Sequence, residues 1–373
     1  MATGECMHVG GLQRVREEVS LIKLTLDILN LHLDEPFVSN KGSVTNVRQM
    51  VVHLHWERYV GIGTAVFAKE YGMHAHTVQE ALAKCAKLFS GATPFEIEHL
   101  LDLVEAVVPG QPTVVAAVDM ALHDLLGKVV GLPLHRLWGF DGLPLPSTGL
   151  SVGVRHEQEL IERVQQFAQW PILKIKLTAA HDVHLVRRLR DVYAGRIWID
   201  GNGSWEDAKE AVAASEVFYE CGVELLEQPI RAGLLECLRV VREYSPIPIV
   251  VDEDCFGPQD VLRVKDCADV INIKLLKCGG LRRALEMIRL ARRLGFAVML
   301  GCKTESVVGI TAMAQLAGLA DYLDLDGHLD LSDDPYSGMT VVRGQILLPE
   351  KPGIGVTTQS EKYRKTRTEV EQQ

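Results

Sequence analysis

Residues 223–254, VELLEQPIRAGLLECLRVVREYSPIPIVVDED, contain one complete repeat of the fold. A short apolar run ends in Glu227, a segment of helical length follows, and a second apolar run ends in Asp252. Strands that alternate with helical segments form parallel sheets, because the intervening helix returns the chain to the same starting edge. We therefore expect both acids at the carboxyl ends of neighbouring parallel strands.

The same pattern extends on both sides of this repeat. Eight apolar runs follow one another at intervals of 22 to 27 residues, with centres at Leu150, Ile175, Ile199, Leu225, Val250, Asn272, Met299 and Leu325. Eight strands at a nearly constant interval, each followed by room for one helix, predict a closed parallel βα barrel.

The N-terminal part has a different pattern of apolar residues. Residues 19–25 and 49–55 alternate like strands around a polar, turn-rich stretch at 34–46, and residues 77–88 and 114–130 have helical spacing. These features predict a small α+β domain.

We predict three parts in the chain. Residues 1–140 form the α+β domain, in which about the first 18 residues are a flexible extension, and residues 141–343 form the barrel. Residues 344–373 are too few for another domain, so we expect them to pack back on the first one.

Charge and cysteine usage limit the function classes. The net charge of -10 disfavours nucleic acid or an acidic membrane surface as a partner, because like charges repel. The eight cysteines form no CxxC pair, and the first 19 residues lack the apolar core of a signal peptide. We therefore expect a cytoplasmic protein with a small-molecule substrate.

Charged residues follow the predicted strands in a systematic way. Lys174 and Lys176 lie two apart on one strand and point to the same side, and the next strand ends in Asp200. Together with Glu227 and Asp252, Asp200 places a carboxylate at the ends of three consecutive strands. Three acids that converge would repel one another unless a hard cation lay between them, and oxygen ligands suit Mg²⁺.

A second lysine ends the sixth strand, at Lys274. In an eight-stranded ring this position is opposite Lys176, so a carbon between them could lose a proton to one lysine and regain it from the other. Lysine acts as a base only if its pKa falls, and Lys174 next to Lys176, desolvation and the cation favour that shift. Asp324 and Asp326 end the eighth strand, where two acids suit a substrate ammonium group.

In this order and spacing, the blocks KIK, IDGN, LLEQP, VVDED and NIKLLKCGG resemble the enolase superfamily, in its muconate lactonizing enzyme subgroup, over nearly the whole chain. The resemblance implies an α/β fold, a modified (β/α)7β TIM-like barrel with a capping domain made of the N-terminal part and the C-terminal tail. It also implies a homo-oligomer, Mg²⁺ on the three acids, and Lys176 and Lys274 as the acid/base pair.

The Asp324-Leu325-Asp326 pattern is similar to that of the dipeptide epimerases, where the matching pair holds the substrate ammonium. This implies Mg-dependent epimerisation of a dipeptide at the α-carbon of its C-terminal residue, by two-base 1,1-proton transfer through an enediolate. The alanyl-glutamate epimerases carry an arginine on a first-domain loop, whereas FVSNKGSV (37–44) offers Lys41 and Gly42. We therefore do not expect specificity for an acidic second residue.

Other functions are compatible with the same lysines and metal ligands. An N-acylamino acid racemase or an o-succinylbenzoate synthase needs no ammonium receptor, and Asp324 and Asp326 could instead be a helix cap and a surface acid. A muconate-type cycloisomerase is disfavoured, because these acids would repel its dicarboxylate substrate. A non-catalytic scaffold is disfavoured by the intact lysine pair.

Four further residues complete the predicted site. Asn202 either supports Asp200 or the waters of the metal, or forms an Asn-Gly turn. Glu253 is either a substrate contact or a helix cap, and Cys302 and Lys303 line the pocket at the end of the seventh strand. Lys277 is predicted to belong to the turn that starts the next helix.

Overall fold

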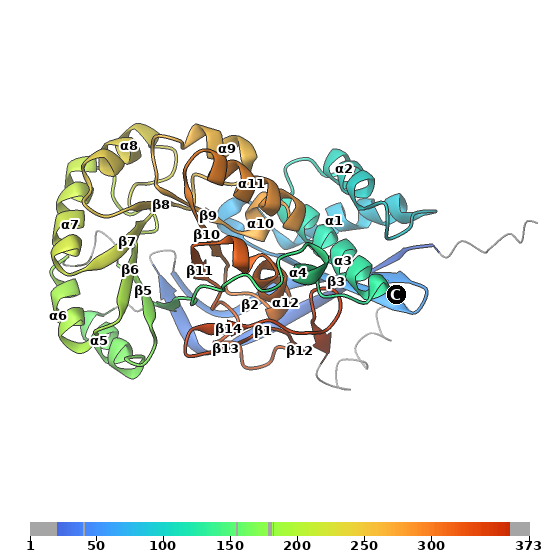
Figure 1. The fold of residues 1–373 in the computed structure, drawn as a ribbon, viewed down its shortest axis with the longest axis horizontal. Coiled ribbons are helices and arrows are strands. Elements are labelled where there is room, and N and C mark those ends of the chain that lie inside the picture. Colours follow the sequence, from blue (N-terminus) through green and yellow to red (C-terminus); the bar gives the residue numbers. More distant parts are fainter. Residues whose placement is uncertain (1–20, 40–41, 154–155, 178–180, 182, 359–373) are drawn as a thin grey trace, which may run out of the picture.

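The computed structural model describes residues 21–358, apart from 40–41, 154–155, 178–180 and 182. A three-stranded antiparallel sheet with its helices forms a cap, and an eight-stranded parallel sheet surrounded by helices forms a barrel (Figure 1). The predicted fold class, a modified (β/α)7β barrel with an α+β capping domain, is confirmed. Within the described ranges, no helix is both long and apolar enough to cross a membrane.

The sheet of the cap consists of β1 (Lys23–Ser39), β2 (Gly42–Trp56) and β3 (Tyr59–Val66), paired in this order. The turn predicted at 34–46 is wrong in its extent, because β1 and β2 pair again from Phe37–Val44 to Ser39–Gly42 after a register shift between His32 and Phe37. Residues 42–46 are exposed, so this part of the ladder is held by backbone pairing and shows no apolar alternation.

The helices of the cap pack on one face of this sheet. Gly61 and Gly63 allow close contact with the longest of them, since a Cβ atom at either position would collide with the helix backbone. The predicted helices at 77–88 and 114–130 correspond to α1 and α3, whereas α2 was not predicted. The helices of the cap are α1 (Ala75–Cys85), α2 (Ile97–Val107), α3 (Pro112–Val130) and α4 (Leu134–Leu137), with short 3-10 turns η1 (Lys69–Tyr71) and η2 (Ala86–Phe89).

The opposite face of the sheet meets the barrel. Val51 and Ile62 belong to the same apolar cluster as the outward-facing residues of the barrel strands, whereas Met50 and Val52 pack against the cap helices. Strand alternation therefore assigns successive residues of β2 to two different cores.

The barrel strands follow one another in chain order around the sheet. They are β4 (Leu150–Val152), β5 (Ile172–Lys176), β6 (Arg196–Asp200), β7 (Val223–Glu227), β8 (Ile249–Val251), β9 (Val270–Ile273), β10 (Ala297–Gly301) and β11 (Tyr322–Asp324). A parallel bridge between Thr148 and Leu323 joins the first and last strands. Seven of the eight predicted centres lie within strands, and Leu325 immediately follows β11.

Helices cover the outside of the barrel (Figure 1). They are α5 (Glu157–Gln166), α6 (Leu185–Val192), α7 (Ala208–Glu220), α8 (Leu235–Tyr244), α9 (Pro258–Arg263), α10 (Leu275–Cys278), α11 (Leu281–Arg293) and α12 (Val307–Ala314), followed by η3 (Ala317–Leu319).

An apolar layer fills the inside of the barrel. Its buried residues come from successive strands and include Ile172, Trp198, Leu225, Val250, Val270 and Met299. Residues two positions further along these strands point the same way, and they include Lys174, Asp200, Glu227 and Asp252. The charged layer therefore lies directly on an apolar floor, at the carboxyl ends of the strands.

The last described residues form two small antiparallel pairs, β12 (Tyr336–Ser337) with β15 (Thr357–Thr358) and β13 (Thr340–Val342) with β14 (Gln345–Leu347). Gly353 exchanges backbone hydrogen bonds with Leu132 and Leu134 of the cap. Ile354 donates to the buried carboxylate of Asp124 on α3. The boundaries at 140 and 343 remain predictions, and residues 359–373 lie outside the described part of the chain.

Candidate active site

Three neighbouring strands bring the predicted metal ligands to one edge of the barrel. Lys176, Asp200 and Glu227 are successive partners in the registers of β5, β6 and β7, and Asp252 follows β8 directly. The three acids are at most 2% exposed, so nearly all of their charge must be balanced inside the protein.

Lys174 lies at the centre of this arrangement. Its Nζ atom is 3.1 Å from Asp200 Oδ2 and 2.8 Å from Glu227 Oε2. The same atom donates a hydrogen bond of 2.7 Å to Asp324 Oδ2. A single ammonium group, itself 1% exposed, therefore contacts carboxylates from three strands.

The two predicted acid/base lysines contact different carboxylates. Lys176 Nζ lies 2.5 Å from Asp200, and Lys274 Nζ lies 2.7 Å from Asp252. Their strands, β5 and β9, are separated by three strands in the sheet order, so the lysines approach the carboxylates from different sides of the barrel.

Two residues of this cluster were not predicted to be part of it. The buried ammonium of Lys277 lies 2.5 Å from Asp252 Oδ1, although the sequence predicted only a turn residue. The Asn272 amide donates a 2.9 Å hydrogen bond to Glu227 Oε1. The alternation of Asn272 with Lys274 on one strand could have indicated its inward direction, whereas Lys277 reaches the site only through the short helix α10.

Burial and neighbouring charges shift the ionisation of these groups. Burial raises the pKa of Glu227 to about 7; Lys174 opposes the rise, and Asp200 and Asp252 add to it. Burial would also raise the pKa of Asp200, but Lys174 and Lys176 together hold it below its ordinary range. The negative charge is therefore least well compensated at Glu227.

The expected fall in the pKa of lysine is not observed at Lys274. Burial lowers the pKa of this ammonium, but Asp252 raises it more, so that it lies well above its ordinary value. The acid that was predicted as a metal ligand is thus the group that keeps Lys274 protonated. A cation that engaged Asp252 would weaken this effect.

The chemistry of the donor set fits a hard divalent cation. Among the described residues, no three His, Cys, Asp or Glu side chains are already arranged around one point as a metal cluster. The three acids offer oxygen donors, and Glu227 Oε2 is buried without a hydrogen-bond partner in the described part of the chain, 2.8 Å from the Lys174 ammonium. Oxygen donors that carry excess negative charge are the ligands that Mg²⁺ prefers.

The acids of the eighth strand lie at and directly after the end of β11, and Asp324 shares the Lys174 ammonium with Asp200 and Glu227. Asp324 is paired with Lys174, whereas Asp326 Oδ2 accepts a 2.5 Å hydrogen bond from the Ser151 backbone N–H. Burial and the neighbouring Asp324 raise the pKa of Asp326 to about 7. An added cationic group near Asp326 would relieve this repulsion.

The four remaining predicted residues have separate positions. The backbone N–H of Asn202 donates a 3.0 Å hydrogen bond to Asp200 Oδ1, and Asn202 adopts a φ of 46°. This agrees with both the supporting and the turn interpretation. Glu253 is half-buried beside Asp252, and its charge raises the pKa of Tyr71.

The residues after the seventh strand point in two directions. Burial, together with Asp326 and Asp324, raises the pKa of the Cys302 thiol well above its ordinary value. Lys303 is directed towards the cap, where its ammonium contacts Glu70 and lies 5.3 Å from the centre of the Tyr71 ring.

Tyr71 is a cap residue that sequence reasoning missed. Its ring packs edge-on against Phe256 at 5.1 Å, and burial followed by the Asp252 charge raises the pKa of its hydroxyl group. Tyr71 therefore covers the side of the mouth next to Asp252 and Lys274. Its place follows from docking of the cap, so no local sequence signal could have found it.

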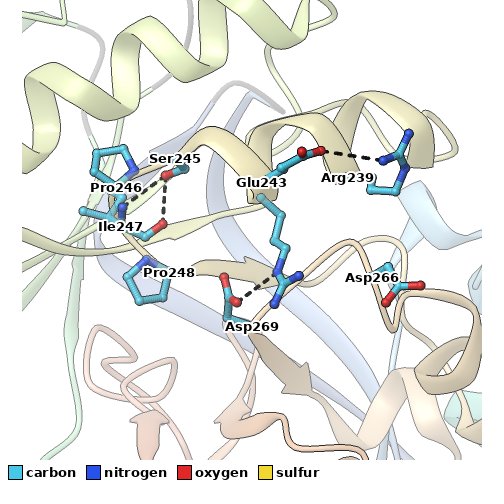
Figure 2. Close-up of a pocket in the computed structure, with 9 residues that line it drawn as sticks. Arg239, Glu243, Ser245, Pro246, Ile247, Pro248, Asp266 and Asp269 are labelled. Atoms are coloured by element: carbon cyan, nitrogen blue, oxygen red, sulfur yellow. Dashed lines mark hydrogen bonds and ion pairs between the residues drawn. The ribbon is translucent and has the colours of Figure 1, made fainter.

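A separate surface hollow lies at the other end of the barrel. Figure 2 shows Ser245, Pro246, Ile247 and Pro248 on one side of it and Asp269 on the other. These residues precede β8 and β9, whereas the charged cluster follows the strands. The arginines of the hollow are already paired, Arg239 with Glu236 and Glu243 and Arg242 with Asp269. We therefore assign the chemistry to the opposite end.

Comparison with known proteins identifies the family. Residues 22–139 match the N-terminal domain of the mandelate racemase/muconate lactonizing enzymes, and residues 157–362 match the enolase C-terminal domain-like family. The chain belongs to this family within the enolase superfamily, which confirms the predicted resemblance and the prediction of an enzyme.

Several individual proteins are similar to this chain over most of its length. The L-Ala-D/L-Glu epimerase of Bacteroides thetaiotaomicron is 34% identical over 336 residues, which are 90% of this chain and 88% of that protein. The L-Ala-D/L-amino acid epimerase of a Maribacter species is 33% identical over 91% of this chain and 99% of its own length. A dipeptide epimerase from Enterococcus faecalis, solved with Mg and L-Leu-L-Tyr, has a TM-score of 0.85 and 28% identity over 90% of this chain and 99% of that one.

Proposed function

We propose that this protein epimerises a dipeptide at the α-carbon of its C-terminal residue, with Mg²⁺ as the cofactor. The observation that carries the proposal is the position of Lys176 and Lys274 on separate strands on either side of one carboxylate cluster. Two ammonium groups in such positions can serve the two faces of one carbon. The similarity to several dipeptide epimerases supports the same reaction.

Asp200, Glu227 and Asp252 would hold the metal ion. When bound, the ion supplies positive charge that binds the carboxylate of the substrate and makes its α-proton more acidic. The lysines would then be released from part of their present ion pairing, because the same carboxylates now serve Lys174, Lys176 and Lys274. Lower lysine pKa values follow from that release.

The proton transfer uses the lysine pair. In one direction, neutral Lys176 removes the α-proton on its side while protonated Lys274 delivers a proton to the other face. In the reverse direction the roles are exchanged. The positions of the two lysines on separate strands keep the two transfers on opposite faces of the α-carbon.

Asp326 and Asp324 would bind the ammonium group of the substrate. Asp326 accepts a hydrogen bond from the Ser151 backbone N–H, and burial together with Asp324 raises its pKa, so a positive charge beside it would be stabilising. This acid pair favours a dipeptide over an N-acylamino acid, which carries no ammonium group at that end. A homo-oligomeric assembly and a cytoplasmic location remain predictions from the sequence.

Incubation with Mg²⁺ and a library of L,L-dipeptides in D₂O tests the proposal. Deuterium should appear at the α-carbon of the second residue and at no other carbon, as measured by NMR or mass spectrometry. The Lys176→Ala, Lys274→Ala double variant is the control, and it should show no exchange. Absence of exchange for every dipeptide with the wild-type protein would contradict the proposed reaction.

A further inference from the structure

Each proposed acid/base lysine contacts one oxygen atom of an aspartate. Lys176 Nζ lies 2.5 Å from Asp200 Oδ2, and Lys274 Nζ lies 2.7 Å from Asp252 Oδ2. The position of each ammonium group therefore depends on the orientation of its carboxylate. The terminal torsion of an aspartate side chain is broad, so a contact to the second carboxylate oxygen is needed to fix that orientation.

The second oxygen of each aspartate is held by a different kind of group. Asp200 Oδ1 accepts a 3.0 Å hydrogen bond from the backbone N–H of Asn202, two residues further along the chain. Asp252 Oδ1 instead lies 2.5 Å from the ammonium of Lys277, a side chain of α10. The orientation of Asp200 is thus set by the main chain, whereas that of Asp252 depends on a lysine side chain.

Lys277 is itself fixed by several contacts. Its Nζ atom also donates hydrogen bonds of 2.6 Å to the Asp252 carbonyl and 3.4 Å to the Asn272 carbonyl. The same atom lies 5.4 Å from the centre of the Phe256 ring, within the distance of a cation–π interaction. Lys277 is buried, and its contact with the Asp252 carbonyl does not depend on the carboxylate. It therefore stays in place when the carboxylate also serves a metal ion.

We propose that Lys277 is a positioning residue for Lys274 in the epimerisation. It fixes Asp252, and Asp252 in turn fixes the ammonium of Lys274 on one side of the substrate α-carbon. Lys277 itself exchanges no proton with the substrate. This inference rests on the proposed function, which assigns Lys274 to one face of the α-carbon and Lys176 to the other.

A positional error at Lys274 slows the proton transfer at one face only. A displacement of about 1 Å of a catalytic group can cost roughly 100-fold in rate. Loss of the Lys277 ammonium removes the contact at Asp252 Oδ1, so the carboxylate can turn and Lys274 moves with it. Lys176 keeps its position, because a main-chain N–H orients Asp200. A defect limited to the Lys274 face therefore distinguishes this role from a general structural one.

The test measures deuterium exchange from each stereoisomer of one dipeptide by Lys277→Met, with Mg²⁺ present. Methionine has nearly the length of lysine but carries no ammonium group. The isomer that Lys274 deprotonates is identified as the one that Lys176→Ala still exchanges. In Lys277→Met we expect kcat for this isomer to fall by at least ~10-fold and kcat for the other isomer by less than ~3-fold, because only one base is displaced.

Two further variants separate positioning from stability. Lys265→Met makes the same chemical change at an exposed lysine just after α9, and it should exchange both isomers like the wild type. Lys277→Gln keeps an uncharged N–H donor on a side chain one atom shorter, and it should give the same asymmetry even if the methionine variant does not fold. Melting temperatures and circular dichroism spectra establish that each variant is folded.

Crystal structures of the metal-free proteins provide a readout that does not depend on activity. In Lys277→Met or Lys277→Gln, the Asp252 carboxylate should be rotated relative to the wild type, and the Lys274 ammonium should be displaced with it. Lys176 and Asp200 should superpose on their wild-type positions.

The outcomes distinguish this inference from the proposed function. Equal loss of exchange from both isomers, or no loss from either, would overturn the role of Lys277 and leave the epimerase proposal intact. Unchanged positions of Asp252 and Lys274 in the folded variants would do the same. No exchange of either isomer by the wild-type protein, with any dipeptide of the library, would overturn both.

Discussion

Lys174 Nζ donates a 2.7 Å hydrogen bond to Asp324 Oδ2, although 150 residues separate them in the chain. The same ammonium group also contacts Asp200 and Glu227. One buried positive charge therefore connects the proposed metal ligands to the proposed ammonium receptor. Any change in charge at one group must alter the ionisation of the other.

Asp326→Asn tests the ammonium receptor while leaving the Lys174–Asp324 pair in place. Because a hydrogen bond to a charged group contributes about 1.5–3 kcal/mol, we expect KM for a dipeptide to rise by roughly 10- to 100-fold. Steady-state epimerisation, followed by circular dichroism or NMR, measures this change. An N-acetylated dipeptide is the control, since its rate does not depend on an ammonium group. Equal KM values for wild type and variant would favour an N-acylamino acid racemase.

Glu227→Gln tests the metal site. The variant loses the carboxylate whose charge is least compensated, so we expect Mg²⁺ to bind at least ~10-fold more weakly, by isothermal titration calorimetry. Mg²⁺ should also raise the unfolding temperature of the wild-type protein after treatment with EDTA, because it binds the folded state. Glu210→Gln, on the exposed surface of α7, should bind Mg²⁺ like the wild type. Equal affinity in all three proteins would place the ion elsewhere.

The ionisation of Glu305 should make stability depend on pH. Burial raises its pKa from 4.5 to about 7, so the folded protein keeps the proton more tightly than the unfolded chain. Stability is then lost as the pH rises from about 4.5 to about 7, and Glu305→Gln should remove this loss. Relative to wild type, we expect the free energy of unfolding of the variant to be up to about 3 kcal/mol higher at pH 8 than at pH 4.5. Urea unfolding at both pH values measures this difference. An equal difference in stability between variant and wild type at the two pH values would contradict the prediction.

Asp119 should be a strong link between the cap and the barrel. It is fully buried on α3 and accepts hydrogen bonds of 2.7 and 3.1 Å from the backbone N–H groups of Leu281 and Arg282, at the start of α11. Asp119→Ala leaves these donors unsatisfied and should cost about 2–4 kcal/mol in unfolding experiments. Asp207→Ala removes an exposed cap from α7 and should cost only about 1 kcal/mol. Similar losses for both variants would contradict this role of Asp119.

The sequence predicted the barrel because its signal is periodic. Each strand is a short apolar run that must be buried on both faces, and the constant interval leaves room for one helix. Asp200, Glu227 and Asp252 could be located for the same reason, since they end three such runs. The structure places all three at the expected edge, where each of them contacts at least one lysine.

Features that depend on contacts between the cap and the barrel could not be predicted. Tyr71 lies in an ordinary turn sequence, and only docking of the cap brings it to the barrel mouth. The length of the β1–β2 hairpin was missed because exposed backbone pairing leaves no apolar pattern. Lys41, on which the predicted lack of specificity for an acidic residue depends, lies outside the described residues.

The most direct test of the proposed reaction is exchange from each stereoisomer of one dipeptide in single-lysine variants. With Mg²⁺ in D₂O, Lys176→Ala should exchange the α-proton of only one isomer, and Lys274→Ala that of only the other, with the melting temperature as a control for folding. Lys209→Ala, on the exposed surface of α7, should exchange both. Loss of the same isomer in both lysine variants, or normal epimerisation by either, would contradict a two-base mechanism.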